Sequence, residues 1–320
     1  MQKEKIDTLL SKTTALKAEI HKRIIGQEET IDQLLIAFLA GGHALLEGVP
    51  GLAKTLMVST LAEAVDLRFR RIQFTPDLMP SDIIGTEILQ TEAHTQSRGF
   101  QFVKGPVFSN IVLADEINRT PPKTQAALLE AMQERSVSYG GKTYNLPNPF
   151  FLLATQNPVE QAGTFPLPEA QLDRFLLYIK MGYPTEEEEL EVLESTTGVD
   201  DKKINAVLDG QEIVQLQQLV REVHINRDLV QWVNALVRNT RPDSSSSTAV
   251  KEWVAWGAGP RAGQAIILTA KARALLQNRY AVVEADLLAV AKPALRHRLL
   301  LNFKAEAEGK NTDEIIASLL

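Results

Sequence analysis

Residues 48–55 of the 320-residue chain are Gly48-Val49-Pro50-Gly51-Leu52-Ala53-Lys54-Thr55. They follow a short apolar run, 43–47, that suits a buried strand, and helical spacing of apolar residues resumes at 54–65. A glycine-bearing turn between a strand and a helix points backbone N–H groups inward, at the positive end of the helix dipole. The segment is a candidate phosphate-binding loop, in which Lys54 reaches the β- and γ-phosphates and the Thr55 hydroxyl ligates magnesium.

The loop departs from the usual pattern G-x-x-x-x-G-K-[ST] at one position, because Ala53 stands where the second glycine is expected. Ordinary helical dihedrals at Ala53 would cost nothing, whereas a positive φ would strain the loop. The alternative interpretation of the whole segment is a plain strand–turn–helix connection, for which glycine and proline suffice.

Residues 69–74 could form the next strand, short, β-favouring apolar runs lie at 110–114, 150–155 and 176–181, and helical patterns separate these segments. This alternation predicts an α/β domain with a mostly parallel, helix-covered sheet. After residues 183–185 the strand patterns stop and helix patterns continue to the C-terminus. We therefore expect an α/β domain over 1–184 and a helical domain over 185–320.

Two adjacent carboxylates, Asp115 and Glu116, end the apolar run at 110–114. Adjacent residues of a strand point to opposite faces, so the two carboxylates cannot perform the same task. Asp115 could hold magnesium through water, together with Thr55, and Glu116 could act as the general base toward an attacking water. The alternative is a strand end that is acidic without a catalytic role. Both motifs would lie at the carboxyl edge of one parallel sheet, where open α/β folds bind ligands.

Three further residues follow in the chain. Asn157, just past the run at 150–155, could orient the water or contact the γ-phosphate, although alone it is only a turn signal. Arg174 and Arg261 could neutralise developing phosphoryl charge, because arginine offers a rigid planar fork of donors. For either arginine by itself, a surface salt bridge is the alternative.

The composition excludes several other kinds of site. There are no cysteines, so a disulfide framework, a thiolate metal site and a cysteine nucleophile are excluded, and the five histidines show no metal-ligand spacing. The net charge of −6 argues against a nucleic-acid coat protein. No apolar run approaches the roughly 20 residues that span a bilayer. Because no apolar segment follows the charged start, we expect no secretion signal and a soluble, cytoplasmic protein.

The order of these motifs resembles that of AAA+ ATPases. Residues 48–55 look like Walker A, Asp115-Glu116 like Walker B, Asn157 like sensor 1, Arg174 like the arginine finger and Arg261 like sensor 2. The surrounding residues are closer still to the MoxR family, in segments 113–119, 121–125, 128–134, 154–158 and 167–175, and in Ile25-Gly26-Gln27 before the first strand. The resemblance covers nearly the whole chain.

The resemblance implies a P-loop NTPase core of the AAA+ type, with parallel strands in the order 5-1-4-3-2, and a C-terminal all-α lid domain. The MoxR family belongs to the helix-2-insert clade and is related to magnesium-chelatase ATPase subunits. It carries two hairpin insertions, expected here at 85–107 and 135–149. Its members form rings, usually hexamers, that act as chaperone-like motors on client proteins, and their partners often contain a von Willebrand factor A domain. Alanine recurs in this family at the position of Ala53, whereas Gly259 departs from the serine often seen two residues before sensor 2.

In the mechanism that the resemblance implies, ATP and Mg2+ bind between the two domains, with Ile25-Gly26-Gln27 near the adenine. Arg174 lies too far from its own nucleotide and serves the γ-phosphate of the neighbouring subunit. The helical domain pivots on Arg261 as the nucleotide changes, and the two insertions pass the movement to a client.

Three other functions are open alternatives. A nucleotide-gated scaffold would assemble with little hydrolysis, although the intact Asp115-Glu116 pair argues against it. The acidic balance disfavours a nucleic-acid motor, and a small-molecule kinase would need neither Arg261 nor a separate helical domain. We also expect His297, between two arginines, to lie on a solvated helix face.

Overall fold

The computed structural model describes residues 2–91, 98–158, 163–196 and 202–320. Five strands form one sheet in the N-terminal part: β1 (Ala44–Glu47), β2 (Phe69–Gln73), β5 (Ile111–Asp115), β8 (Phe151–Gln156) and β9 (Leu177–Lys180). Their order across the sheet is β2-β5-β8-β1-β9, and every neighbouring pair is parallel. Counted along the chain and read from the β9 edge, this order is 5-1-4-3-2, which confirms the predicted core.

The sheet is buried on both faces because its central strands carry apolar side chains on both. All five residues of β5 are buried. Ile111 and Leu113 belong to a cluster with α1 (Gln2–His21), α2 (Glu28–Leu39) and α3 (Lys54–Ala64). Val112 and Ala114 belong to a second cluster with α5 (Pro122–Glu134). Because successive strand residues point to opposite faces, an unbroken apolar run fills two helix layers at once.

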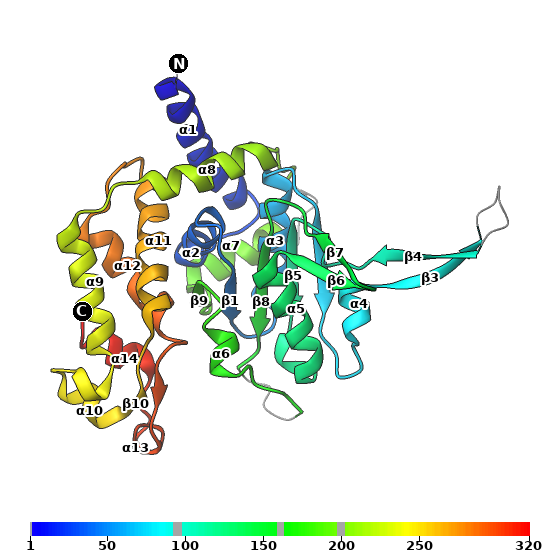
Figure 1. Cartoon of the computed structure of the whole chain (residues 1–320). Helices are drawn as coiled ribbons and strands as arrows, with labels where there is room; N and C mark the ends of the chain where they lie inside the picture. Colours follow the sequence, from blue (N-terminus) through cyan, green and yellow to red (C-terminus); the bar gives the residue numbers. More distant parts are fainter. Residues whose placement is uncertain (1, 92–97, 159–162, 197–201) are drawn as a thin grey trace.

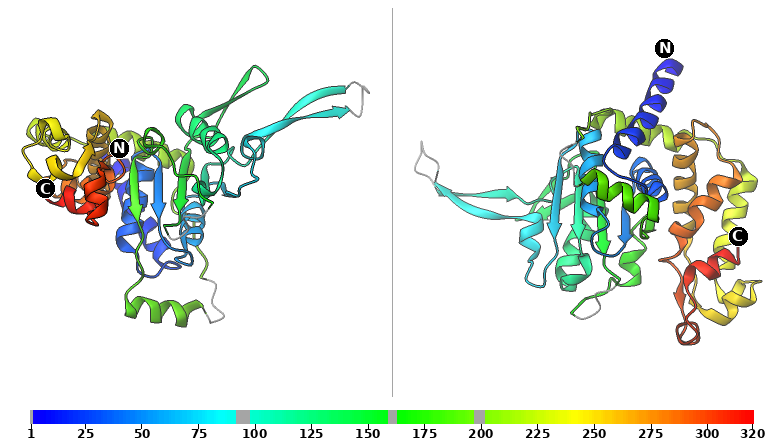
Figure 2. Two further views of the ribbon diagram at one scale, coloured as in Figure 1. Left: turned by 90° about the horizontal axis from the view of Figure 1, so that it is seen from below. Right: turned by 180° about the vertical axis from the view of Figure 1, so that it is seen from behind.

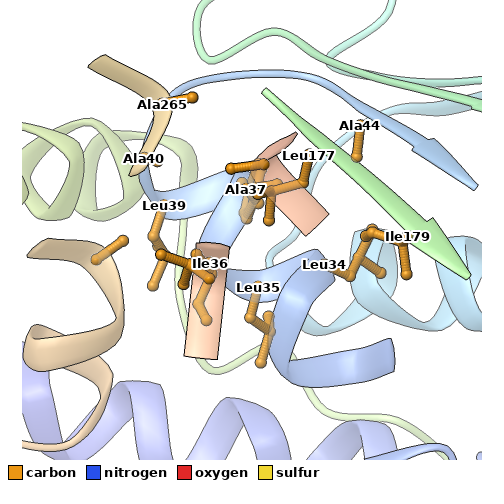
Figure 3. Packing of buried hydrophobic residues seen from close by; sticks show 14 of the residues in the cluster. Leu34, Leu35, Ile36, Ala37, Leu39, Ala40, Ala44, Leu177, Ile179 and Ala265 are labelled. Carbon is orange, nitrogen blue, oxygen red and sulfur yellow. The ribbon is translucent and has the colours of Figure 1, made fainter. Parts of the chain in front are cut away.

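Figure 3 shows the layer that α2 forms on the sheet, with Leu34 and Ala37 alongside Ile179 and Leu177 of β9. Each such fully buried leucine or isoleucine contributes about 1.5–3 kcal/mol through the hydrophobic effect. The same cluster continues into the C-terminal helices through Ala265, so α2 joins the two parts of the molecule.

Two hairpins stand where the insertions are expected. The first pairs β3 (Gly85–Thr91) with β4 (Arg98–Lys104) after α4 (Pro80–Ile84), and residues 92–97 within it lie outside the described part of the chain. It projects away from the sheet (Figures 1 and 2). The second pairs β6 (Ser136–Tyr139) with β7 (Lys142–Asn145). Phe102 stacks on Tyr144 with ring centroids 4.4 Å apart, so the bases of the two hairpins pack together.

The C-terminal part is mainly helical, and its helices are α8 (Gly210–Glu222), α9 (Arg227–Asn239), α10 (Thr248–Trp253), α11 (Pro260–Leu276), α12 (Glu284–Leu295), α13 (Phe303–Ala307) and α14 (Thr312–Ala317). Sequence analysis missed one feature of it. The strands β10 (Val254–Trp256) and β11 (Leu300–Leu301) form a short antiparallel ribbon. Runs of two or three residues are too short to show an alternating pattern.

The connection between the two parts includes α7 (Glu186–Thr196). The short helix α6 (Glu169–Leu172) precedes β9, and two 3-10 turns, η1 (Ile117–Arg119) and η2 (Pro242–Ser244), lie elsewhere in the chain. Beyond residue 184 the chain first runs along the sheet domain, since the Val207 N–H donates to Ala64 O at 2.8 Å and Arg23 Nε donates to Lys202 O at 2.9 Å. The boundary at 184 stays a prediction. Among the described residues, no helix combines the length and apolar character that crossing a membrane requires.

Candidate functional site

The phosphate-loop candidate lies between β1 and α3, as its sequence predicts. Gly51 has φ 88°, in the region that favours glycine. Lys54 opens α3, and its Nζ donates to the carbonyl of Gly48 at 2.8 Å, across the loop. The Gly48 N–H donates to Gln156 O of β8 at 3.3 Å. The loop is therefore closed by its own lysine and fixed to the neighbouring strand.

Ala53 adopts φ 55° and ψ 24°, which is left-handed rather than helical. Of the two conformations considered from the sequence, the strained one is present. For a residue with a side chain this conformation costs roughly 1–2 kcal/mol. Ala53 is the residue just before α3, so its left-handed backbone directs the chain from the loop into that helix.

The acid pair lies at the carboxyl end of β5, and Asp115 is 7% exposed. Its Oδ1 accepts from the Thr155 hydroxyl at 2.6 Å, and its Oδ2 accepts from Arg71 Nη2 at 2.6 Å and Arg71 Nε at 3.0 Å. Both oxygens of the Asp115 carboxylate thus have partners, one of them a cation.

Glu116 begins the turn after β5 with φ 58°. Its backbone N–H donates to Thr155 Oγ1 at 2.8 Å, so one threonine holds both acids. The Glu116 carboxylate accepts from Gln73 Nε2 at 2.7 Å and from Arg119 Nη1 at 3.1 Å. The left-handed residue turns the Glu116 side chain away from the position it would have on a continuing strand.

Arg71 and Gln73 were missed in the sequence, although a signal was available. They are two residues apart in β2 and so share one face of the strand, and Gln73 is directly opposite Asp115 in the parallel register. Thr155 lies on β8, the strand on the other side of β5. Sheet order was needed to bring these three residues to one place.

The loop and the acids lie at the same edge of the sheet, because β1 and β5 both pair in parallel with β8. Burial lowers the pKa of the Lys54 ammonium below its usual range, while the negative charges of Asp115 and Glu116 act to raise it. We group Lys54, Thr55, Asp115 and Glu116 as a candidate site for a nucleotide and call this group the nucleotide site. Asn157 follows β8 near this edge and is 5% exposed.

Ile25-Gly26-Gln27 forms a left-handed turn before α2, with φ 62° at Gly26 and 54° at Gln27. Gln27 Nε2 donates to Gly182 O at 3.0 Å, which joins this turn to the chain after β9. A Cβ on Gly26 would lie 2.2 Å from the Glu188 carboxylate carbon of α7. The turn is thus enclosed by the segment that connects the two parts of the molecule.

Arg174 and Arg261 lie together in a separate cavity of about 290 Å³. Arg174 Nη1 is 3.5 Å from the carbonyl of Leu129 in α5. Arg261 is the second residue of α11, and its Nη1 is 3.7 Å from Asp173 Oδ2. Two more arginines, Arg135 and Arg298, line the same cavity, which we call the arginine cavity. The structure brings the two predicted arginines together, and none of the residues lining this cavity belongs to the nucleotide site.

The expectation that His297 lies on a solvated face is wrong. Its exposed fraction is 9%, its ring stacks on Tyr178 with centroids 5.9 Å apart, and its Nε2 is 3.0 Å from Phe175 O. Burial holds the pKa of His297 well below its usual range. Arg298 is only 4% exposed, and its Nε donates to Asp173 Oδ1 at 2.8 Å. These residues at the end of α12 pack on the sheet domain, so they fix the lid and are not solvated.

Comparisons with known proteins agree with this geometry. Residues 43–177 match the model of the ATPase family associated with various cellular activities (AAA), and residues 246–319 match the AAA lid domain. The chain is 45% identical over 304 residues to Chaperone MoxR1 of Mycobacterium tuberculosis, covering 94% of this chain and 79% of that protein. It is 42% identical over 304 residues to the uncharacterized protein YeaC of Bacillus subtilis, covering 94% and 91%.

Two further matches extend the comparison. Protein MoxR of Methylorubrum extorquens is 31% identical over 298 residues, covering 88% of this chain and 86% of that protein. A crystal structure from Cytophaga hutchinsonii, described as a candidate ATPase, superposes with a TM-score of 0.92 at 44% identity and covers 99% of this chain and 96% of that chain. With the sheet order, the lid and these relatives together, the chain belongs to the MoxR family of AAA+ ATPases.

Proposed function

We propose that this protein is a ring-forming motor that hydrolyses ATP to ADP and phosphate and uses the energy to remodel or activate client proteins. The observation that carries the proposal is that β1, which leads into the loop with Lys54, and β5, which ends in Asp115 and Glu116, both lie beside β8 and run parallel to it, so the loop and the acids are at one carboxyl edge of the sheet. A cation for the phosphates and a carboxylate for the attacking water are the two groups that phosphoryl transfer to water requires.

In the proposed step, a water oxygen bonds to the γ-phosphorus while the bond from that phosphorus to the β–γ bridging oxygen breaks. Glu116 takes a proton from the water, and ADP leaves with the electron pair of the broken bond. Gln73 and Arg119 hold the Glu116 carboxylate in this structure. At least one of these contacts must give way to the water before Glu116 can act as a base. Asn157 would orient the same water.

The donor set fits magnesium. The Thr55 hydroxyl and the Asp115 carboxylate are hard oxygen donors, which Mg2+ prefers. Among the described residues, no three His, Asp or Glu side chains converge as a metal site, so phosphate oxygens and water would complete the coordination. Bound Mg2+ would neutralise charge on the β- and γ-phosphate oxygens. Arg71, which holds Asp115 in this structure, already supplies a positive charge at that carboxylate.

For the adenine we propose the turn Ile25-Gly26-Gln27, where α7 and the segment after β9 meet the start of α2. Glu188 lies on Gly26, so a nucleotide bound there would contact the connection between the two domains. We propose the division of the chain at residue 184 into 1–184 and 185–320. An adenine at this turn would then contact residues of both domains.

We propose a ring, most simply a hexamer, in which the arginine cavity serves the nucleotide of the neighbouring subunit. Arg174 and Arg261 line one cavity that includes no residue of the nucleotide site. Both arginines would therefore meet the same γ-phosphate from a second chain, and Arg261 would couple that contact to the lid. The motion would reach a client through the two hairpins, which are joined by the Phe102–Tyr144 stack.

The client is the part of the proposal that rests on resemblance. The relative from Mycobacterium tuberculosis bears the name chaperone. We propose a similar role here, with a von Willebrand factor A domain protein as client or partner and with the cytoplasm as the compartment that supplies ATP. We propose no nucleic-acid partner, because the net charge is −6.

Calorimetry with ATP and magnesium tests the nucleotide site. We expect uptake of ATP by the wild type and by the control Lys251→Ala, which removes an exposed lysine of α10, and no measurable uptake by Lys54→Ala. If the wild type took up no adenine nucleotide, the motor would be ruled out.

A nucleotide-gated scaffold with little hydrolysis is the second candidate, and one observation favours it. Arg71 holds Asp115, and Gln73 with Arg119 holds Glu116, so both acids already have partners. Steady-state release of phosphate at saturating ATP separates the two. Turnover at the roughly 1–10³ s⁻¹ of typical enzymes supports the motor, whereas binding without turnover supports the scaffold.

A further inference from the structure

Arg135 ends α5 with a backbone conformation that residues with a side chain rarely adopt. Its φ is 51° and its ψ is 29°. Many helices end on a left-handed residue, but that residue is usually glycine, because a Cβ is crowded there. The backbone contact at this position, in which the Leu146 N–H donates to Arg135 O at 2.9 Å, would be equally available to glycine. An unfavourable conformation that is held in place is a reason to look for a function of the side chain.

The Arg135 side chain extends to the arginine cavity. Its Nη2 donates to Gly41 O at 3.0 Å, and it lines the cavity together with Arg174 and Arg261. The buried His43 lies close by. Burial is the largest cause that lowers the pKa of His43 to about 3, and the positive charge of Arg135 is the next. His43 therefore stays neutral and adds no charge to the cavity.

The charges in the arginine cavity do not balance. Four arginines line it, and Asp173 is its single acid. Arg298 is buried and donates to Asp173 Oδ1 and to the carbonyl of Phe175, so it largely neutralises that acid. The positive charges of Arg135, Arg174 and Arg261 remain in excess. A cavity of about 290 Å³ lies just below the ~300–1,000 Å³ of whole-ligand sites, which suits a phosphate group better than a whole nucleotide.

We propose that Arg135 is a third arginine that, with Arg174 and Arg261, contacts the γ-phosphate of ATP bound to the neighbouring subunit. This inference rests on the proposed function. As the water oxygen bonds to phosphorus and the bridging bond breaks, negative charge gathers on the γ-phosphate oxygens and on the leaving ADP. The planar donor fork of Arg135 stabilises that charge, while the proton goes to Glu116.

The left-handed backbone supplies an unusual test. Arg135→Gly removes the guanidinium and also relieves the backbone, so it should fold at least as well as the wild type. Removal of one preorganised donor lowers kcat by about 10²–10³ in other enzymes, and because two arginines remain we expect roughly a tenfold to hundredfold loss here. Arg135→Lys keeps the charge without the fork and should recover part of kcat. The matched control is Arg227→Ala, an exposed arginine of α9 outside the cavity, which should keep wild-type kcat.

Mixed rings distinguish a contact in trans from a structural effect. Arg135→Gly subunits have an intact Glu116, and Glu116→Gln subunits have an intact Arg135. We expect the mixture to hydrolyse ATP faster than either variant alone, with the Kd for ATP unchanged and the melting temperature of Arg135→Gly equal to or above that of the wild type.

Three results would overturn the inference: wild-type kcat in Arg135→Gly, a loss of kcat that mixing does not restore, or a lowered melting temperature that accounts for the loss. The same mixing experiment with Arg174→Ala separates this failure from failure of the proposed function. If Arg174→Ala is inactive and rescued while Arg135→Gly stays fully active, only the role of Arg135 is lost. If Arg174→Ala keeps wild-type activity, the shared site itself is wrong.

Discussion

The nucleotide site and the arginine cavity differ in how their charges are matched. At the nucleotide site, Lys54 is at the same edge of the sheet as Asp115 and Glu116, and Arg71 and Arg119 hold the two acids. In the arginine cavity, four arginines face one aspartate. One region has its acids paired within the chain, whereas the other has an excess of positive charge and a small cavity beside it.

This difference agrees with our proposal that each region is half of a catalytic site. The nucleotide site has the phosphate-loop candidate and Glu116, the base that we propose, but its four residues include no arginine. The arginine cavity has donors for a phosphate, and its one acid, Asp173, is already paired with Arg298. Two copies of the chain, placed so that the cavity of one meets the nucleotide of the next, would complete each other. The predictions below test that complementarity, in order of decreasing effect.

Arg174→Ala should have the largest effect, because of the three arginines that we assign to the γ-phosphate of the neighbour it removes the one that resembles the arginine finger. We expect kcat to fall about 10³–10⁵-fold while ATP still binds. Phosphate release measures kcat, and titration with a fluorescent nucleotide measures binding. Mixing with Glu116→Gln subunits should restore part of the activity, and a complete lack of rescue would show that the two regions do not meet between subunits.

Glu116→Gln should have the next largest effect, since it removes the general base that we propose in the nucleotide site. We expect kcat to fall about 10²–10⁴-fold with ATP binding retained. Glu130→Gln, which changes an exposed carboxylate of α5, is the control and should turn over normally. Wild-type turnover in Glu116→Gln would remove Glu116 from the mechanism. If the variant holds ATP, the protein trapped with it identifies the client.

Acid should destabilise the fold through His43, which lines the arginine cavity. Its pKa is lowered to about 3, so the folded state keeps it neutral where the unfolded chain takes up a proton. This contribution is fully present above about pH 6.5 and is lost toward pH 3, at about 1.4 kcal/mol for each pH unit.

Chemical denaturation at pH 7.5 and pH 5.5 measures the difference that His43 makes. We expect a smaller pH dependence in His43→Asn than in the wild type, even if the variant is less stable at both values. Arg135→Gly should raise the pKa of His43 slightly, because it removes the second cause of the shift. An identical pH dependence in His43→Asn would show that His43 does not titrate in this range.

Ala53→Gly should have the smallest effect, and of the opposite sign. Glycine relieves a left-handed backbone but loses more entropy on folding, so we expect a gain of about 0.5–1 kcal/mol in the free energy of unfolding. Ala126→Gly, in the exposed interior of α5, is the control and should lose about 1 kcal/mol. A loss of stability in Ala53→Gly would mean that the Cβ of Ala53 makes a contact that outweighs the strain.

The sequence predicted the features that depend on neighbouring residues. The five core strands lie within a residue or so of the segments that indicated them. The central strands β5 and β8 were the clearest, because a strand buried on both faces must be apolar throughout. The loop at 48–55 and the acids at 115 and 116 could also be located, since each depends on a strand followed at once by a particular turn. The lid was expected to be helical, and the ribbon of β10 and β11 was missed.

The tertiary structure decided which distant side chains meet. Thr155 reaches Asp115 because β8 is beside β5 in the sheet, and Arg298 is buried because α12 packs on the sheet domain. Arg135, Arg174 and Arg261 come from three separate elements, and no spacing in the chain places them in one cavity. The conformation of a strand or a turn depends on consecutive residues, so the sequence can predict it. The partners of a charged side chain depend on how whole elements pack, and that packing is fixed only when the chain has folded.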